Sequence, residues 1–195
     1  MMHNGHEYVD LGLPSGLKWA TCNVGAIKPQ EYGDYFAWGE TTPKQSYVES
    51  NYKWYKKSFF GGAYKLTKYK DERESLLEYT DDAARVNWGG KWRMPTRTEQ
   101  DELRNHCTWE WTTLNGEKGY KVISKKNGNS IFLPAAGRRC NNLFKAGSDG
   151  DYWSSSLNTS NSSYAYDLTF YSGSVDRNYN SRYLGRSVRA VCECA

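Results

Sequence analysis

The sequence predicts a mixed α+β domain in which short antiparallel strands outnumber helices. Few stretches repeat apolar residues at helical spacing, which argues against a helical bundle. Two Asn-Gly pairs, Asn115-Gly116 and Asn127-Gly128, separate strand-like runs and predict tight hairpins. Hydrophobic residues make up 38% of the chain and aromatic residues 15%, so the core must depend on rings. The length of 195 residues suits a single domain, which we place at 6–195.

Overall composition excludes several classes of protein. Mean hydropathy is -0.86, and no apolar run approaches the ~18 residues that a membrane span needs. The 18 Gly and 5 Pro exclude collagen-like and Pro-rich disordered chains. The polar first residues give no secretory signal. A net charge of +4 permits an anionic partner without demanding one.

The first 90 residues divide into a strand-rich part and a long excursion. Strands are expected at 8–11 and 17–20, around a Pro14-Ser15-Gly16 turn, and at 35–38. In the excursion, 39–90, lysines alternate with aromatic rings, a pattern that can bind single-stranded nucleic acid. The acidic stretch 71–82 nearly cancels that positive charge, so we expect no nucleic-acid ligand and interpret the excursion as a solvated loop anchored by its rings.

The middle of the chain predicts one clear helix followed by three strands. The helix is expected over 96–107, where Thr96 with Glu99 can form a capping box and Leu103 and Cys107 share a face. Strands are expected at 108–112, 120–124 and 131–135. A closing strand is expected around Val188 and Val191. Four tryptophans, Trp19, Trp38, Trp92 and Trp153, are expected to form a buried framework.

The segment 138–187 has the composition of a binding surface. Ser, Asn and Tyr supply 23 of its 50 residues, Glu is absent, and Lys145 is its only lysine. Tyr gives large, stiff contact area, and Ser and Asn give adaptable hydrogen bonds, as in antibody-type surfaces. Strand alternation over 164–171 argues against a disordered tract. It predicts Leu168 and Phe170, with Tyr164 and Tyr166, on the core face.

The same alternation predicts the outward face of this strand and of the strand beyond the Ser172-Gly173 turn. Side chains expected to face outward are Ala165, Asp167, Thr169 and Tyr171, then Ser174 and Asp176, with Val175 inward. A slip of one residue in register would exchange the two sets.

Six segments together resemble the Fibrobacter-type major paralogous domain over nearly the whole chain. They are YVDLGLPSGLKWATCNVGA (8–26), GDYFAWGE (33–40), WRMPT (92–96), FLPAAG (132–137), YWSSS (152–156) and SVRAV (187–191). The resemblance implies a C-type-lectin-like fold of the formylglycine-generating-enzyme subtype, with small antiparallel sheets and about two helices.

The tail further resembles the variable proteins of diversity-generating retroelements. In those systems adenine-directed mutagenesis rewrites chosen codons near the 3′ end of a gene, and the scaffold tolerates the exchanged side chains. The resemblance, carried over by position, implies a diversified ligand-binding set within 138–187. Its candidates are Arg139, Asn141, Asn142, Asp151, Tyr164, Asp167, Thr169, Tyr171, Ser174, Asp176, Asn178, Tyr179, Asn180, Tyr183, Leu184 and Arg186.

Three other functions were weighed against this interpretation. A fixed cell-surface adhesin or carbohydrate-binding module would use the same exposed tyrosines for sugar stacking. A formylglycine-generating-enzyme-like oxidase would need a reactive thiol, and Cys192-Glu193-Cys194 and Cys140 lack the catalytic context of that family. A calcium-dependent lectin would need more oxygen ligands than Asp149-Gly150-Asp151 supplies.

We therefore expect a non-enzymatic binding protein without metal or cofactor. The resemblance implies a protein or glycan on a cell surface as ligand, and a phage virion or bacterial cell surface as the place of display. The five cysteines are an odd number, so at least one is unpaired within the chain, and a disulfide scaffold is not expected. The oligomeric state does not follow from the sequence.

Overall fold

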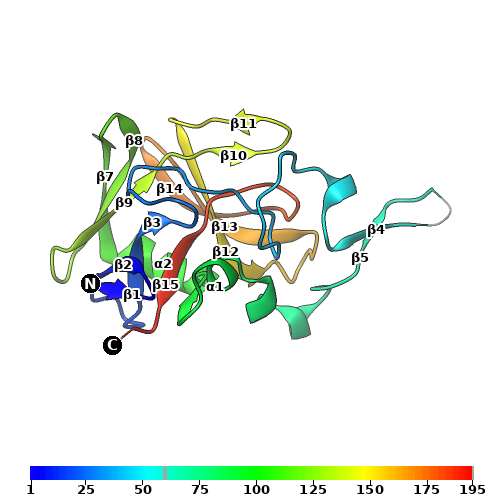
Figure 1. The fold of residues 1–195 in the computed structure, drawn as a ribbon, viewed down its shortest axis with the longest axis horizontal. Helices are drawn as coiled ribbons and strands as arrows, with labels where there is room; N and C mark the ends of the chain where they lie inside the picture. Colours follow the sequence, from blue (N-terminus) through cyan, green and yellow to red (C-terminus); the bar gives the residue numbers. More distant parts are fainter. Residues whose placement is uncertain (59–60, 195) are drawn as a thin grey trace.

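The computed structural model describes residues 1–58 and 61–194. Residues 59, 60 and 195, which fall inside the predicted excursion and domain, lie outside the described residues. The described chain is an assembly of small antiparallel sheets with two α-helices, which confirms the predicted α+β class. In Figure 1 the two chain ends lie close together, and the β4–β5 hairpin projects from the opposite side.

Short strands dominate the element list. The strands are β1 (Met2–His3), β2 (His6–Asp10), β3 (Lys18–Asn23), β4 (Tyr55–Lys57), β5 (Tyr64–Leu66), β6 (Trp92–Arg93), β7 (Cys107–Leu114), β8 (Glu117–Ser124), β9 (Ser130–Pro134), β10 (Arg138–Arg139), β11 (Leu143–Phe144), β12 (Asp149–Leu157), β13 (Tyr164–Tyr171), β14 (Ser174–Ser181) and β15 (Arg189–Cys192). The helices are α1 (Ala83–Trp88) and α2 (Arg97–His106), with 3-10 turns at Glu49–Asn51, Glu72–Glu74 and Tyr79–Asp81.

One sheet joins the two ends of the chain. Its strand order is β1-β2-β3-β15-β6, so the C-terminal strand lies between an N-terminal strand and β6. The pairing of Met2 with Glu7 brings residues before the predicted domain start at 6 into this sheet. The indole Nε1 of Trp92 donates to the carbonyl of His3 at 3.0 Å and fixes β1 against the core.

The helix predicted for the middle of the chain and the tight hairpin predicted at Asn115-Gly116 are present, whereas Asn127-Gly128 lies in a longer loop, 125–129, between β8 and β9. Thr96 caps α2, its hydroxyl accepts from the Glu99 N–H, and the Glu99 carboxylate accepts from the Thr96 N–H. These two bonds satisfy backbone groups that a helix start leaves unpaired. Strands β7, β8 and β9 follow as a three-stranded sheet. Asn115 and Gly116 both adopt positive φ, as a tight two-residue hairpin requires.

The tail forms a second three-stranded sheet in the order β12-β13-β14. Strand β13 pairs with β14 along its full length, and the register runs from Tyr171 opposite Ser174 to Tyr164 opposite Ser181. The far edge of β12 is covered by isolated bridges, because Gly150 pairs with Gly137 and Tyr152 with Ser187. The outer edge of the sheet is therefore β14.

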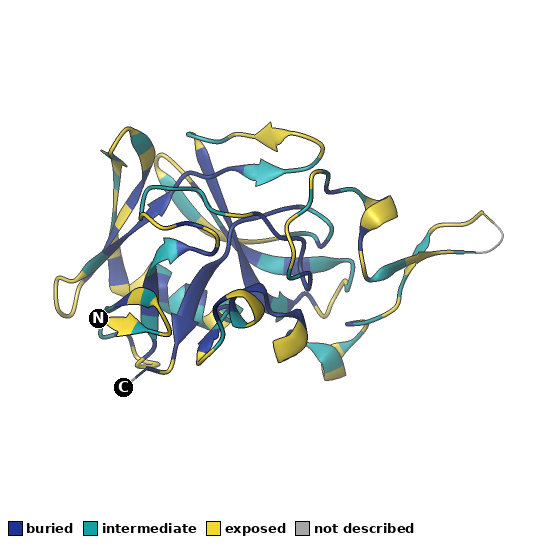
Figure 2. Cartoon of the chain, viewed as in Figure 1, coloured by how far each residue is buried: buried dark blue, intermediate teal, exposed yellow. Residues whose placement is uncertain are grey.

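Aromatic rings fill the core, as the composition predicts. Trp19, Trp38, Trp92 and Trp153 are all at most 2% exposed, which confirms the predicted framework. The buried residues, concentrated in the central strands of Figure 2, fall into two clusters. One gathers Trp38, Trp92 and Trp153, and the other gathers Trp19 with residues of β7–β9, α2, β12 and β13.

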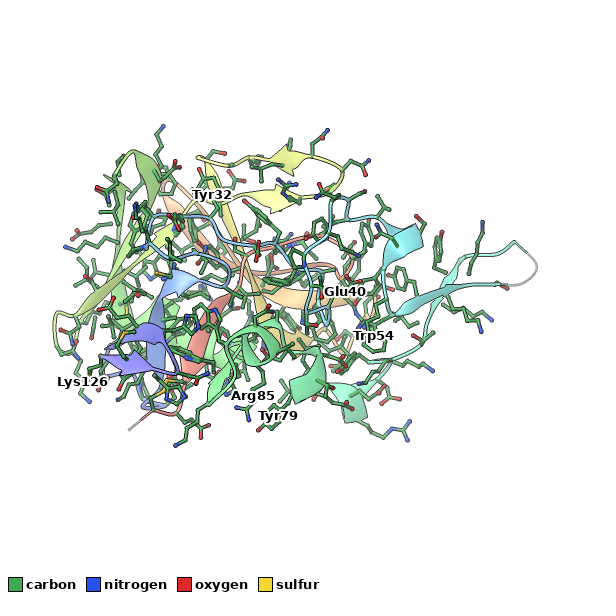
Figure 3. The ribbon with its side chains drawn as sticks, viewed as in Figure 1. Tyr32, Glu40, Trp54, Tyr79, Arg85 and Lys126 are labelled. Atoms are coloured by element: carbon green, nitrogen blue, oxygen red, sulfur yellow. A yellow bond between two sulfur atoms is a disulfide. The ribbon has the colours of Figure 1, made fainter. Side chains whose placement is uncertain are left out.

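Only part of the excursion over 39–90 projects from the domain, and the rest is packed into it. The rings of Tyr47, Tyr52 and Tyr69 are at most 3% exposed, and residues of α1 enter the core. The indole Nε1 of Trp54 donates to the carbonyl of Gly39 at 3.0 Å. Figure 3 shows the Trp54 side chain near Glu40. The basic residues do not form a free patch throughout, because Lys53 and Lys68 are ion-paired with the buried carboxylate of Asp81. The anchoring rings thus build the inner part of the excursion into the domain.

The strand expected at 35–38 is wrong. In this segment Phe36 makes a single bridge with Arg186, and the Trp38 N–H donates to the carbonyl of Arg182. The segment is nevertheless buried, and Trp38 belongs to the core as predicted. The segment runs alongside the loop that carries Arg182 and Arg186 and does not join a sheet. A run of four apolar residues predicts burial but does not distinguish a strand from a buried irregular segment.

We expect Trp153→Ala to destabilise the domain by roughly 3–5 kcal/mol, because it empties a fully buried ring site. Tyr171→Ser, at a ring that is 52% exposed, should leave the melting temperature nearly unchanged. Thermal and urea unfolding of both variants measure the difference. Unfolding of the Tyr171→Ser protein would mean that the two faces of β13 are reversed.

Candidate functional site

The two faces of the β12–β13–β14 sheet carry different side chains. Side chains at directly paired positions point to the same face. Asp151, Thr169 and Asp176 form one such row, and Trp153, Asp167 and Asn178 form the next. The opposite face carries Tyr152, Leu168, Phe170 and Val175, which pack into the second core cluster together with Leu103 of α2.

Six of the predicted site residues gather on the face away from that cluster, on β13 and β14. We name this set the polar face. Its side chains are exposed or partly exposed, and they are Thr169, Tyr171, Ser174, Asp176, Asn178 and Asn180. The structure thus brings together six residues of the carried-over candidate set, of which strand alternation also predicted Thr169, Tyr171, Ser174 and Asp176 to face outward.

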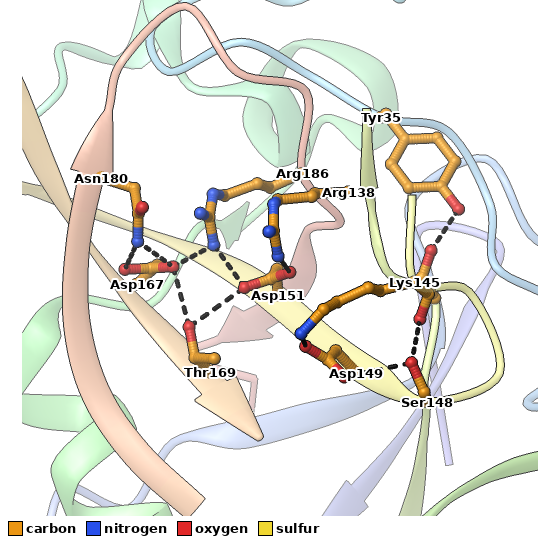
Figure 4. Close-up of polar contacts among 11 residues, drawn as sticks. Tyr35, Arg138, Lys145, Ser148, Asp149, Asp151, Asp167, Thr169, Asn180 and Arg186 are labelled. Carbon is orange, nitrogen blue, oxygen red and sulfur yellow. Dashed lines mark hydrogen bonds and ion pairs between the residues drawn. The ribbon is translucent and has the colours of Figure 1, made fainter. Parts of the chain in front are cut away.

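A buried ionic cluster lies next to the polar face, on the same face of the sheet (Figure 4). The Arg186 guanidinium contacts both carboxylates, with Nη1 at 2.6 Å from Asp151 Oδ1 and in closer contact with Asp167 Oδ2. Arg138 Nη1 lies 3.2 Å from the other oxygen of Asp151. Two carboxylates and two guanidiniums make the cluster neutral. Burial raises the pKa of Asp167, and the charge of Arg186 opposes that rise.

Polar side chains connect this cluster to the surface. The Thr169 hydroxyl lies 3.1 Å from a carboxylate oxygen of Asp151 and of Asp167. The Asn180 amide donates to Asp167 at 3.3 Å. The cluster therefore holds the inner part of the polar face in one arrangement, while Tyr171, Asp176 and Asn178 lie beyond it on the open side.

Three predicted site residues are not on the surface. Asp151, Asp167 and Arg186 are at most 1% exposed, so their prediction as displayed side chains is wrong. Ala165, also expected outward, is buried in the first core cluster. The cause is the segment 182–188, which folds back over this face of β13 and covers its first half. Strand alternation shows which residues share a face but does not show what lies on that face.

The other predicted residues lie in four separate places. Tyr164 and Tyr179 are on the opposite face of the sheet, with ring centroids 5.7 Å apart. Asn141 and Asn142 are exposed at the tip of the β10–β11 hairpin. Tyr183 and Leu184 are half-buried in the turn before β15, and Arg139 lines a hollow of about 320 Å³ with Asp34, Tyr35 and Tyr47. They do not join the polar face.

The sequence did not predict the β10–β11 hairpin, which lies along one side of the candidate site. Arg138 and Lys145 tie it to β12 through Asp151 and Asp149. Its exposed apolar side chains are Leu143 and Phe144, 40% and 51% exposed, and the Arg138 guanidinium stacks over the Phe144 ring. Two-residue strands give no periodic signal, so only an isolated Leu-Phe pair in a polar segment could have indicated this hairpin.

Comparison of the chain with protein-family models, with curated proteins and with solved structures gives no match. Within residues 1–58 and 61–194, no group of three or more His, Cys, Asp and Glu side chains could hold a metal ion. No helix of this described part is long and apolar enough to cross a membrane. Asp149 and Asp151, weighed above as cation ligands, are instead ion-paired with Lys145 and Arg138.

The cysteines divide into one bonded pair and three free thiols. Cys192 is disulfide-bonded to Cys194, and Cys22, Cys107 and Cys140 are free. Cys107 is 3% exposed, and burial raises its pKa to about 11. At neutral pH this side chain is therefore a thiol and not the nucleophilic thiolate.

Breaking the buried cluster should destabilise the protein far more than changing an exposed residue of the polar face beside it. We expect Arg186→Met to cost roughly 3–5 kcal/mol, because it leaves two buried carboxylates without their shared partner. The matched change Asn178→Ala, at an exposed position of the same sheet, should stay within about 0.5 kcal/mol. Chemical denaturation measures the free energy of unfolding of both variants. Equal losses of stability would contradict the distinction between the buried cluster, which holds the strands, and the exposed polar face, which does not.

Alkylation of the native protein should label two of its three free cysteines. Cys22 and Cys140 are partly exposed. Cys107 should react only after unfolding, because burial keeps it protonated. Mass spectrometry after iodoacetamide treatment at pH 8 without reductant counts the adducts. A thiol that reacts much faster than free cysteine would instead support an oxidase-type nucleophile.

Proposed function

We propose that the chain is a non-enzymatic binding protein of the C-type-lectin-like fold, formylglycine-generating-enzyme subtype, and the variable protein of a diversity-generating retroelement. One observation carries the proposal. Six of the predicted diversified residues share one face of the sheet, and a neutral, buried ionic cluster beside them holds the strands. Exchange of Tyr171, Ser174, Asp176 or Asn178 leaves the contacts of this cluster unchanged, whereas Thr169 and Asn180 hydrogen-bond to it.

The composition of the polar face supports a protein or glycan on a cell surface as ligand. Tyr171 offers a large half-exposed ring, and Phe144 on the neighbouring hairpin offers a second one. Rings of this kind act as anchors at binding interfaces, while Ser, Asn and Asp provide hydrogen bonds that can be adjusted one at a time. Display on a phage virion or a bacterial cell surface fits such a ligand.

The buried ionic cluster restricts which of the candidate codons can vary. Codons for Tyr171, Ser174, Asp176 and Asn178 can change freely, because their side chains end in solvent or at its border. Codons for Asp151, Asp167 and Arg186 cannot change one at a time without giving the buried cluster a net charge. The proposed variable set is therefore smaller than the set implied by the resemblance.

Sequencing the 3′ end of this gene in closely related isolates tests the proposal. We expect substitutions confined to adenine positions of the polar-face codons, with the three buried positions constant. An invariant tail would remove the retroelement function and leave a fixed adhesin, to be tested on glycan arrays. Substitutions spread evenly over exposed and buried positions would contradict the structural basis of the proposal.

A further inference from the structure

We infer that the outer edge of β14 binds an extended acidic segment of a partner protein by strand addition. This inference concerns the backbone edge and the face next to α2, so it does not depend on diversification of the polar face. In an antiparallel pair, residues alternate between those bonded to the neighbouring strand and those whose backbone groups point away. The first step is to find which residues of β14 point away.

The register of the β13–β14 hairpin shows which residues of β14 direct their backbone groups away from β13. Tyr171 and Ser174 flank a two-residue turn and form a hydrogen-bonded pair, so Val175, Arg177 and Tyr179 direct their backbone groups to the open edge. Two contacts agree with this phase: Arg104 Nε reaches the Val175 carbonyl at 3.4 Å, and the Tyr179 N–H donates to the Asn178 side chain at 2.9 Å. Within the described residues, the outward groups of Arg177 have no hydrogen-bond partner.

An arginine-rich strip runs beside this edge, on the face next to α2. Arg97, Asp101 and Arg104 lie along one side of the helix, and Asp101 is shared by Arg104 and Arg177 at 2.8 Å each. Three guanidiniums against one carboxylate leave a surplus of two positive charges. Asp176, the acidic residue of β14, points to the polar face instead.

Tyrosine rings continue the strip along the strand. The Arg97 guanidinium stacks 4.5 Å from the centre of the Tyr166 ring, and Tyr166 packs edge-on against Tyr179, which is 51% exposed. A strand added to β14 would place every second side chain over these rings and guanidiniums. Its backbone would pair with Arg177, and acidic side chains on that face would meet the positive surplus.

The same charges select between possible occupants. A second copy of this chain, paired antiparallel through β14, would bring two positive strips together, and like charges on facing strands oppose pairing. An acidic segment is attracted to the strip and pairs through backbone hydrogen bonds that are the same for any side chain. The edge therefore suits a partner segment that is extended and acidic on alternate positions.

A synthetic probe tests the inference on the full chain. The probe is an acetylated and amidated octapeptide of alternating Thr and Glu, and its control is the same peptide with Lys in place of Glu. We expect the acidic peptide to shift the backbone amide resonances of β14 and to slow hydrogen exchange at the Arg177 amide. The basic peptide should do neither.

Two charge variants complete the test. Arg97→Gln combined with Arg177→Gln should weaken binding of the acidic peptide roughly tenfold, since it removes two favourable surface charges. Lys118→Gln with Lys121→Gln, on β8, removes the same charge away from the arginine strip and should change binding less than twofold. Absence of binding at millimolar peptide overturns the inference, as does binding that leaves exchange at Arg177 unchanged. Dimerisation of the free protein through β14 would overturn it in favour of self-pairing.

Discussion

Three buried arginines on one returning segment hold the parts of this molecule together. Arg182, Arg186 and Arg189 are each at most 2% exposed, and each serves a different part of the chain. Arg182 donates to Tyr52 and to the carbonyls of Lys68 and Tyr69. Arg186 neutralises the two carboxylates of the tail sheet, and Arg189 donates to Asn23 and two carbonyls of β3. A buried guanidinium is costly unless hydrogen bonds and opposite charges compensate it, so these contacts restrict the path of the segment. The compensation is incomplete, because Arg186 Nε and Arg189 Nη2 are buried without a hydrogen-bond partner within the described residues.

That path divides the tail sheet into a locked part and an open part. The returning segment and the β10–β11 hairpin cover β12 and the first half of β13, and β14 is left at the margin, with four of its eight residues exposed and the other four partly exposed. Side chains over the covered part complete hydrogen bonds or pack in the core. Those on β14 contribute little to folding, which is the condition a surface must meet if its side chains are to change without loss of the scaffold.

Much of the fold could be predicted because it depends on local chemistry. The capping box at Thr96 and Glu99, the Asn-Gly hairpin at 115–116 and the alternation of Leu168 with Phe170 each act over a few residues. The predictions failed where distant segments decide. Phe36 pairs with a loop 150 positions away in sequence, and Asp167 is buried by an arginine that the sequence places 19 positions later. Neither contact has a periodic signal.

The sequence by itself determined the class of fold, the aromatic core and the polar, tyrosine-rich character of the tail, because composition and short-range periodicity fix what a segment can bury. Only the tertiary structure decided which polar residues of the tail reach solvent. Asp151, Asp167 and Arg186 look like surface residues in the sequence, yet together they form a neutral cluster that can be buried. The physical reason is that a single charge is too costly to bury alone, so its burial depends on a partner of opposite charge. That partner comes from another part of the chain, and only the tertiary structure brings the two together.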